Sequence, residues 1–158
     1  MYQKIYPDIE KRIQEIIEDD YEVAVLGTIG KENYPFVSKI VPMYKNKKLY
    51  VLISDLSEHT QNVTANNKVS FYFSLKEINN TKSNNPRLTL NGTITKLKLD
   101  KNSQEFLQLL RTYQKIEKGS EMWGMFSDFN FYIFNPFRAL FIEGFGKAYQ
   151  KIYSSKEF

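Results

Sequence analysis

The chain has 158 residues, of which 42% are hydrophobic, 25% charged and 15% aromatic, and its formal net charge is +4. This length and balance predict one globular domain over residues 1–158 and exclude fibrous and disordered classes. The lack of cysteine excludes disulfide scaffolds, thiolate metal sites and cysteine nucleophiles, and the single histidine, His59, cannot form a histidine metal cluster within one chain.

The charge pattern and the N-terminus give expectations about partners and location. The lysines are scattered and form no stripe that follows a helix or strand, so we expect no nucleic-acid partner. The sequence MYQKIYPDIEKR has no signal-peptide core, and no segment reaches the roughly 20 apolar residues of a membrane helix. We therefore expect a cytoplasmic protein without a membrane partner.

The first predicted element is an amphipathic helix within residues 1–20. Isoleucines recur at helical spacing on one face, at Ile9, Ile13, Ile16 and Ile17. Pro7 is well suited to the first turn of such a helix. This helix is expected to cover the core.

Strands dominate the middle of the chain. Five segments are rich in β-branched or aromatic residues and are separated by turn residues: 23–29, 36–44, 49–54, 69–75 and 87–97. A short helix is predicted between the third and fourth of them, starting at Ser54 or Asp55. A polar loop over residues 78–85 precedes the fifth.

The last third of the chain predicts a second long helix and two more strands. Asn102 and Glu105 have the spacing of a capping box, and the helix that they introduce is expected to end near Gly119. Strands over 129–134 and 139–142 follow, separated by a turn at Asn135-Pro136. Residues 149–158 are expected to form a C-terminal tail. Together, these elements predict an α+β protein built on an antiparallel β-barrel with flanking helices.

The segment 53–62 is the strongest candidate for a binding site. A helix that begins directly after a strand presents free N–H groups and the positive end of its dipole to an anion, and Ser54, Ser57, His59 and Thr60 add further donors. The alternative is that Ser54 or Asp55 only caps the helix. Because small barrels have filled interiors, a ligand is expected outside, in a groove or at a subunit contact.

Three residues outside this segment are weaker candidates. Trp123 can form a flat wall for a ring system or pack into the core. Arg87 and Lys147 can contact an anion from a neighbouring subunit or be ordinary surface charges.

Four stretches resemble the pyridoxamine-phosphate-oxidase-like FMN-binding split barrels, and in particular their haem-utilisation (HugZ-like) branch. The stretches are PFVS at 35–38, ISDLSEHTQN at 53–62 with 66–70, NPRLTLNG at 85–92, and 128–148 with its GFGKA ending. The resemblance implies a dimeric split barrel with FMN in a groove between the subunits, acting as a flavin-dependent oxidoreductase. It implies ring contacts at Ser38, Lys39 and Ile40. It also implies phosphate contacts at Ser54, Ser57, His59 and Thr60.

The sequence departs from the family pattern at positions where basic residues would bind the negatively charged phosphate of the cofactor. Glu58 and His59 occupy the place of a basic pair in oxidase-type members, and Ser38 and Met43 stand where further basic residues occur. Fewer cations weaken the binding of a phosphate dianion. Two alternatives to FMN therefore stay open. One is a haem-binding or haem-degrading protein, with His59, Tyr149 or Tyr153 as axial ligand, and the other is a cofactor-free dimer that uses the groove for protein interaction.

Overall fold

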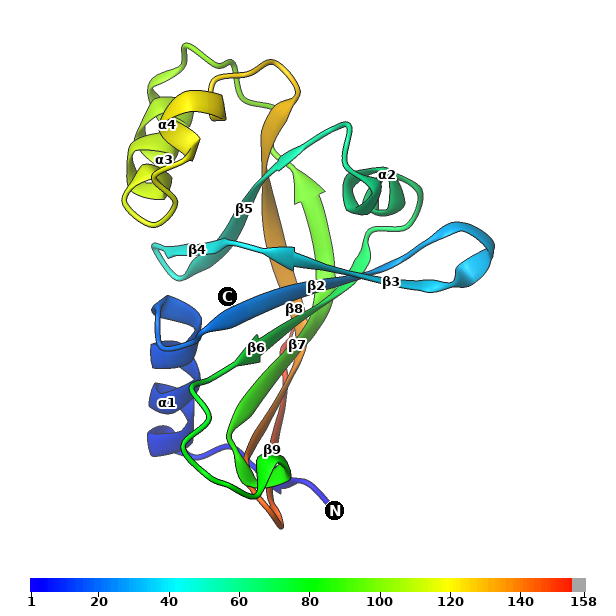
Figure 1. The fold of residues 1–158 in the computed structure, drawn as a ribbon, viewed down its shortest axis with the longest axis vertical. Helices are drawn as coiled ribbons and strands as arrows, with labels where there is room; N and C mark the ends of the chain where they lie inside the picture. The colour runs from blue at the N-terminus through cyan, green and yellow to red at the C-terminus, as the bar shows by residue number, and fades with distance from the viewer. Residues whose placement is uncertain (155–158) are drawn as a thin grey trace.

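The computed structural model describes residues 1–154 and consists of one mixed sheet with helices around it (Figure 1). Its α-helices are α1 (Pro7–Glu18), α2 (Glu58–Ala65), α3 (Gln104–Gln114) and α4 (Ser120–Trp123), with 3₁₀ turns η1 (Lys31–Asn33) and η2 (Lys82–Asn84). Its strands are β1 (Gln3–Lys4), β2 (Val23–Ile29), β3 (Pro35–Ile40), β4 (Pro42–Lys45), β5 (Lys48–Ser54), β6 (Lys68–Ser74), β7 (Arg87–Lys96), β8 (Phe129–Gly144) and β9 (Lys147–Ile152).

The sheet curls into a barrel because one run of chain changes partners. β3 pairs with β2, whereas β4, which follows after Val41, pairs with β5. The ring then continues through β8, β7 and β6 back to β2. The α+β barrel class is confirmed, but the prediction of a single strand over 36–44 is wrong. The run divides at Val41, where its hydrogen bonds pass from β2 to β5.

The predicted turn at Asn135-Pro136 is also wrong, because β8 runs through it. On one side of β8, pairing with β5 stops at Phe134 and pairing with β9 starts at Arg138. Pro136 lies in the gap between these partners, where no neighbour on that side requires its missing N–H. Opposite it, the register of β7 shifts between Asn91 and Gly92.

Several element ends differ from the predictions. Lys147–Ile152, expected partly as tail, forms β9, and its pairing with β1 is parallel, so the sheet is not purely antiparallel. Of the rest of the predicted tail, residues 155–158 lie outside the described residues. α3 is capped by Ser103, which accepts the N–H of Phe106, rather than by Asn102, and it ends at Gln114. α2 begins at Glu58, not at Ser54 or Asp55, because a turn held by Ser54 comes first.

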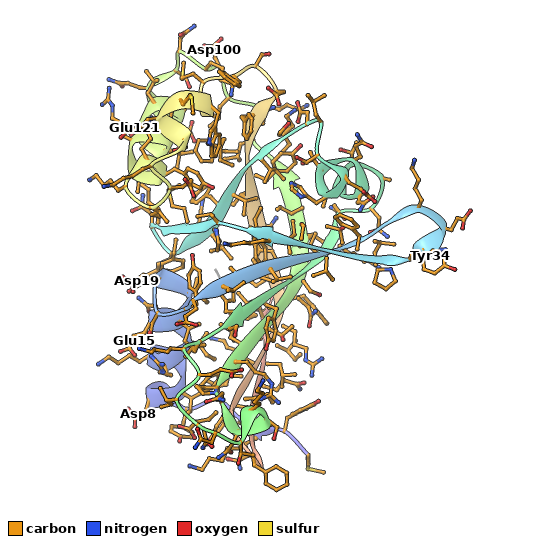
Figure 2. All side chains as sticks on the ribbon, in the orientation of Figure 1. Asp8, Glu15, Asp19, Tyr34, Asp100 and Glu121 are labelled. Carbon is orange, nitrogen blue, oxygen red and sulfur yellow. The ribbon has the colours of Figure 1, made fainter. Side chains whose placement is uncertain are left out.

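The core has two parts. The predicted helix α1 lies against one face of the sheet, and its four isoleucines are buried with residues of β2, β6, β7 and β8. α3 covers the other end of the barrel and packs Phe106 and Leu110 against Phe131. Figure 1 shows α1, α3 and α4 along one side of the sheet, with the β2–β3 hairpin projecting from the other side. Figure 2 shows Tyr34 at the tip of this hairpin.

Candidate functional site

The site lies where the barrel is split. β3 is paired with β2 and not with β5, and residues of both β3 and β5 line a hollow of about 350 Å³. Its lining comes from β3, β5, the start of α2, the α3–α4 region and the start of β8: Lys39, Ile40, Val41, Leu52, Ile53, Ser54, Ser57, His59, Tyr113, Glu117, Trp123 and Phe129. Six of the ten cofactor residues predicted from the sequence are therefore brought together here: Lys39, Ile40, Ser54, Ser57, His59 and Trp123.

α2 is fixed across the split by two side-chain hydrogen bonds to the β2–β3 hairpin. Ser38 Oγ lies 3.2 Å from His59 Nδ1, and Asn62 Nδ2 donates to Thr28 Oγ1 over 3.0 Å. The second bond is buried, so breaking it would leave unpaired polar groups inside the protein. The first turn of α2 is therefore held in place beside β3.

His59 is the most unusual group of the hollow. Its Nε2 is buried and has no hydrogen-bond partner among residues 1–154, while Nδ1 is engaged by Ser38. Burial lowers the pKa of the imidazole, which favours its neutral form. When the Nδ1 proton is donated to Ser38 Oγ, Nε2 carries a buried lone pair without a partner among the described residues.

The first turn of α2 offers hydrogen-bond donors. Within the described chain, no backbone acceptor is found for the N–H groups of Glu58 and His59, and the Ser57 hydroxyl makes no capping bond. Such free amides attract anions. Lys39 is a cation in the lining of the same hollow. Glu58 lines a different groove with Leu56 and Gln61, so its carboxylate is turned away from these donors.

Ser54 lies in the hollow, but its hydroxyl is already engaged. Ser54 Oγ donates to Asp128 Oδ2 and accepts the N–H of Leu56 over 3.1 Å. It has no proton left to donate to an anion in this arrangement. Its local role is to form the turn between β5 and α2.

Asp55 ties the same turn to the sheet. Its carboxylate accepts from Lys96 on β7 and from Asn130 and Tyr132 on β8, at distances of 3.0, 2.9 and 3.4 Å. Burial and the charge of Asp55 raise the pKa of Tyr132 to about 12. The start of α2 is thereby fixed from the sheet side as well.

The wall opposite α2 is aromatic and was largely missed by sequence reasoning. Trp123 packs on Phe129 with ring centres 4.5 Å apart, and Tyr113 donates to the carbonyl of Val41 over 3.1 Å. Burial raises the pKa of Tyr113, so its phenol stays protonated. Glu117 completes this wall. Nothing in the sequence near Tyr113 or Glu117 indicated that α3 would face the split.

The other predicted residues lie elsewhere. Thr60 is buried on the first turn of α2, and its Oγ1 has no partner within residues 1–154. Arg87, at the start of β7, donates to the carbonyls of Ser83 and Asn85, and Lys147, at the start of β9, pairs with Glu143. Figure 1 shows β9 at the opposite end of the barrel from α2. Tyr149 is buried in the core, and a hydrogen bond with Tyr6 raises its pKa.

A second, larger groove lies on the outer face of the sheet. Its volume is about 790 Å³, and strands β2, β3, β6, β7 and β8 form it. Val37 and Phe137 line the groove with 64% and 59% of their surface exposed. Tyr153, one of the candidate axial ligands, lines this groove and another beside α1, but not the hollow. Exposed apolar side chains that gather in this way are typical of an interaction surface.

Comparison with known proteins identifies the fold. The family model described as CREG, beta-barrel, matches residues 16–158. No curated protein sequence matches the chain. Among residues 1–154, no helix is long and apolar enough to cross a membrane, and no group of three or more potential metal ligands is found.

Many solved structures share this fold, including the following three. A heme binding protein from Mycobacterium smegmatis has a TM-score of 0.80 at 17% identity; the match covers 94% of this chain and 59% of that protein, so this chain spans little more than half of its length. HutZ, the heme storage protein from Vibrio cholerae, has a TM-score of 0.65 at 22% identity, and the match covers 80% of this chain and 89% of that protein. A Clostridium acetobutylicum protein related to general stress protein 26, of the pyridoxinephosphate oxidase family, has a TM-score of 0.68 at 19% identity. The match covers 94% of this chain and 96% of that protein.

Proposed function

The chain belongs to the CREG beta-barrel family, and from this premise we propose that it binds FMN in the hollow at the split and acts as a flavin-dependent oxidoreductase. The observation that carries the proposal is the meeting of donors and an aromatic wall in one hollow. The amide of His59, the Ser57 hydroxyl and Lys39 are suited to a phosphate. Trp123 is suited to a flat ring.

The fit of FMN is supported by the direction of the nearby carboxylates. Glu58 faces another groove, and Asp128 accepts the hydroxyl proton of Ser54. Bound FMN would supply hydride or electron transfer. The protein's own residues would hold the phosphate at α2, orient the ring against Trp123 and exclude water from it.

The outer groove supports the proposal of a homodimer of single-domain subunits. Covering Val37 and Phe137 removes apolar surface from water, which favours association. In such a dimer, Arg87 or Lys147 of one subunit could contact an anion bound to the other subunit. Arg87 would first have to leave the carbonyls of Ser83 and Asn85, and Lys147 would have to leave Glu143.

The test is the binding of FMN to the purified chain, followed by quenching of flavin fluorescence. Lys39→Gln should weaken binding about tenfold, equivalent to about 1.4 kcal/mol, because a charge-assisted contact is lost. Lys48→Gln, on the exposed start of β5, is the matched control and should bind like the parent protein. An unchanged flavin fluorescence in the presence of a large excess of protein would contradict the proposal.

Haem is the second candidate, and the unpartnered Nε2 of His59 favours it. A neutral imidazole held through Nδ1 is well suited to iron. Of the three candidate axial ligands, His59 alone is in the lining of the hollow. Bound haem would supply redox and oxygen chemistry.

Titration with haem separates this candidate from the others. A Soret band that is lost in His59→Ala, and kept in Tyr149→Phe and Tyr153→Phe, would support haem ligation by His59. Protein that binds neither haem nor FMN, yet forms a stable dimer, would support the cofactor-free interaction protein instead.

A further inference from the structure

Glu117 places a hydrogen-bond acceptor at the end of the hollow away from α2. It lies after the last turn of α3 and is half-buried. Its Oε1 accepts the N–H of Gly119 over 2.9 Å, which fixes the carboxylate. Its Oε2 has no hydrogen-bond donor or cation within residues 1–154, so this oxygen stays available to a ligand.

A donor stands close to this acceptor. A Cβ atom placed on Gly119 would lie 2.9 Å from Glu117 Oε1 and 3.3 Å from Trp123 Nε1. The carboxylate and the indole nitrogen thus converge on the one residue of this turn that has no side chain. An indole N–H only donates, and a carboxylate only accepts. Glu117 and Trp123, both in the lining of the hollow, therefore bring an acceptor and a donor close together.

The two ends of the hollow prefer opposite groups. The α2 end combines the free amide of His59, the Ser57 hydroxyl and Lys39, and favours an anion. The Glu117 end carries a negative charge, and it repels an anion and favours an N–H donor. Figure 1 shows α2 and the α3–α4 region on opposite sides of the upper end of β5. A ligand with a phosphate at one end and an N–H at the other can satisfy both.

We propose that Glu117 accepts the N3–H of the flavin pyrimidine ring and thereby selects flavins over planar cofactors without such an N–H. This inference rests on the proposed binding of FMN. The ring has a donor N–H between two carbonyl groups, and Trp123 Nε1–H is a suitable donor for one of those carbonyls. Haem has no N–H on its periphery and gains nothing from this carboxylate.

The test compares FMN with N3-methyl-FMN, in which the donor proton is replaced. Glu117→Gln keeps an oxygen for the Gly119 N–H but can place an NH₂ group in the hollow, where it opposes N3–H. We expect the parent protein to bind FMN at least tenfold more tightly than the methylated flavin. In Glu117→Gln this ratio should fall to about threefold or less, mainly through weaker FMN binding. Glu117→Ala, which leaves room for the methyl group, should bring the ratio close to one.

A spectroscopic readout separates recognition from a purely structural role. A carboxylate beside N3–H opposes loss of its proton, so the alkaline spectral change of bound flavin should occur at higher pH in the parent protein than in Glu117→Gln. Glu121→Gln, an exposed carboxylate on α4, should leave both the ratio and the spectral titration unchanged.

The outcomes distinguish the two proposals. If the parent protein binds no FMN, the proposed function fails and this inference fails with it. If FMN binds but the ratio and the spectral titration are the same in Glu117→Gln as in the parent, FMN binding stands and the role of Glu117 is refuted.

Discussion

The hydroxyl of Ser38 on β3 lies 3.2 Å from Nδ1 of His59 on α2, and this contact joins two elements that are 21 residues apart. It crosses the split between β3 and β5 at the edge of the hollow. Since His59 is the only histidine, its behaviour can be isolated by a single substitution.

The Ser38–His59 bond should be visible as an energetic coupling. Ser38→Ala and His59→Gln should each lower the free energy of unfolding, and the double variant should lose about 0.5–1.5 kcal/mol less than the sum of the two. Urea denaturation of the four proteins measures this. Ser103→Ala, which removes the cap of α3, is the control and should be additive with His59→Gln.

The lowered pKa of His59 predicts a stability that depends on pH. Burial disfavours the imidazolium in the folded state, so below the ordinary pKa of about 6.5 the unfolded chain binds more protons than the folded one. Stability should therefore fall as the pH drops from 7.5 through 6.5 towards the folded pKa. His59→Gln should lack this component. Urea denaturation between pH 7.5 and 5.5 measures the free energy of unfolding of the two proteins. If this free energy falls equally steeply with pH in both, the prediction is contradicted.

Ser54 and Ser57 should have separate roles although they are three residues apart. Ser54→Ala removes one hydrogen bond to Asp128 and one from Leu56, so it should cost about 1–3 kcal/mol of stability. Ser57→Ala breaks no capping bond and should change stability by less than about 0.5 kcal/mol. It should instead weaken FMN binding. The reverse pattern in paired denaturation and fluorescence measurements would show that the anion contact is at Ser54.

Gly92 should tolerate no side chain. A Cβ there would lie 2.1 Å from the carbonyl oxygen of Asn135 and 2.6 Å from the ring of Phe134, at the bulge where β7 passes β8. Gly92→Ala should therefore destabilise the fold by at least about 1–3 kcal/mol. Gly27→Ala is the matched control in β2, because its nearest contacts would be an ordinary 3.6 Å or more. Thermal unfolding of the two variants provides the comparison.

The elements with a strong local pattern were predictable. The isoleucine spacing predicted α1, and the alternation of apolar and polar residues predicted β6. Both patterns arise because one face of the element is buried. The division at Val41 was not predictable, since β3 and β4 are equally strand-like and differ only in the neighbour that they pair with. Pro136 misled the prediction for a similar reason. The preference of Asn-Pro for turns is visible in the local sequence. The gap between β5 and β9, which lets Pro136 stay within a strand, is set by the tertiary structure.

The candidate site was predictable only on its α2 side. A strand that runs directly into a helix start signals an anion site, which drew attention to Ser57 and His59. Glu117 and Tyr113 reach the hollow because α3 packs over the end of the barrel. The periodicity of a helix predicts which of its residues are buried, but not that they line a binding site. The engagement of Ser54 by Asp128 depends on two residues 74 positions apart.

The outer groove should hold the dimer together if the protein is a homodimer. Cross-strand pairing puts Val37, Gly27, Ser70, Asn91 and Arg138 in one row on this face, and none of the five is acidic. A lysine introduced there in both subunits would thus find no carboxylate within that row, and it would replace apolar contacts. Val37→Lys and Phe137→Lys should each weaken the dimer, because full burial of such a side chain contributes about 1.5–3 kcal/mol per subunit.

Counted over two subunits, that contribution corresponds to a dissociation constant raised about 100-fold or more. Sedimentation velocity across a range of concentrations measures the shift. Phe145→Lys is the control, because Phe145 is 89% exposed in the turn between β8 and β9 and is not part of the groove lining. Equal dimerisation of the parent, Val37→Lys and Phe137→Lys proteins would place the subunit contact on another face. If the two variants are monomeric instead, their FMN binding shows whether one subunit suffices for the hollow, since Val37 and Phe137 do not line it.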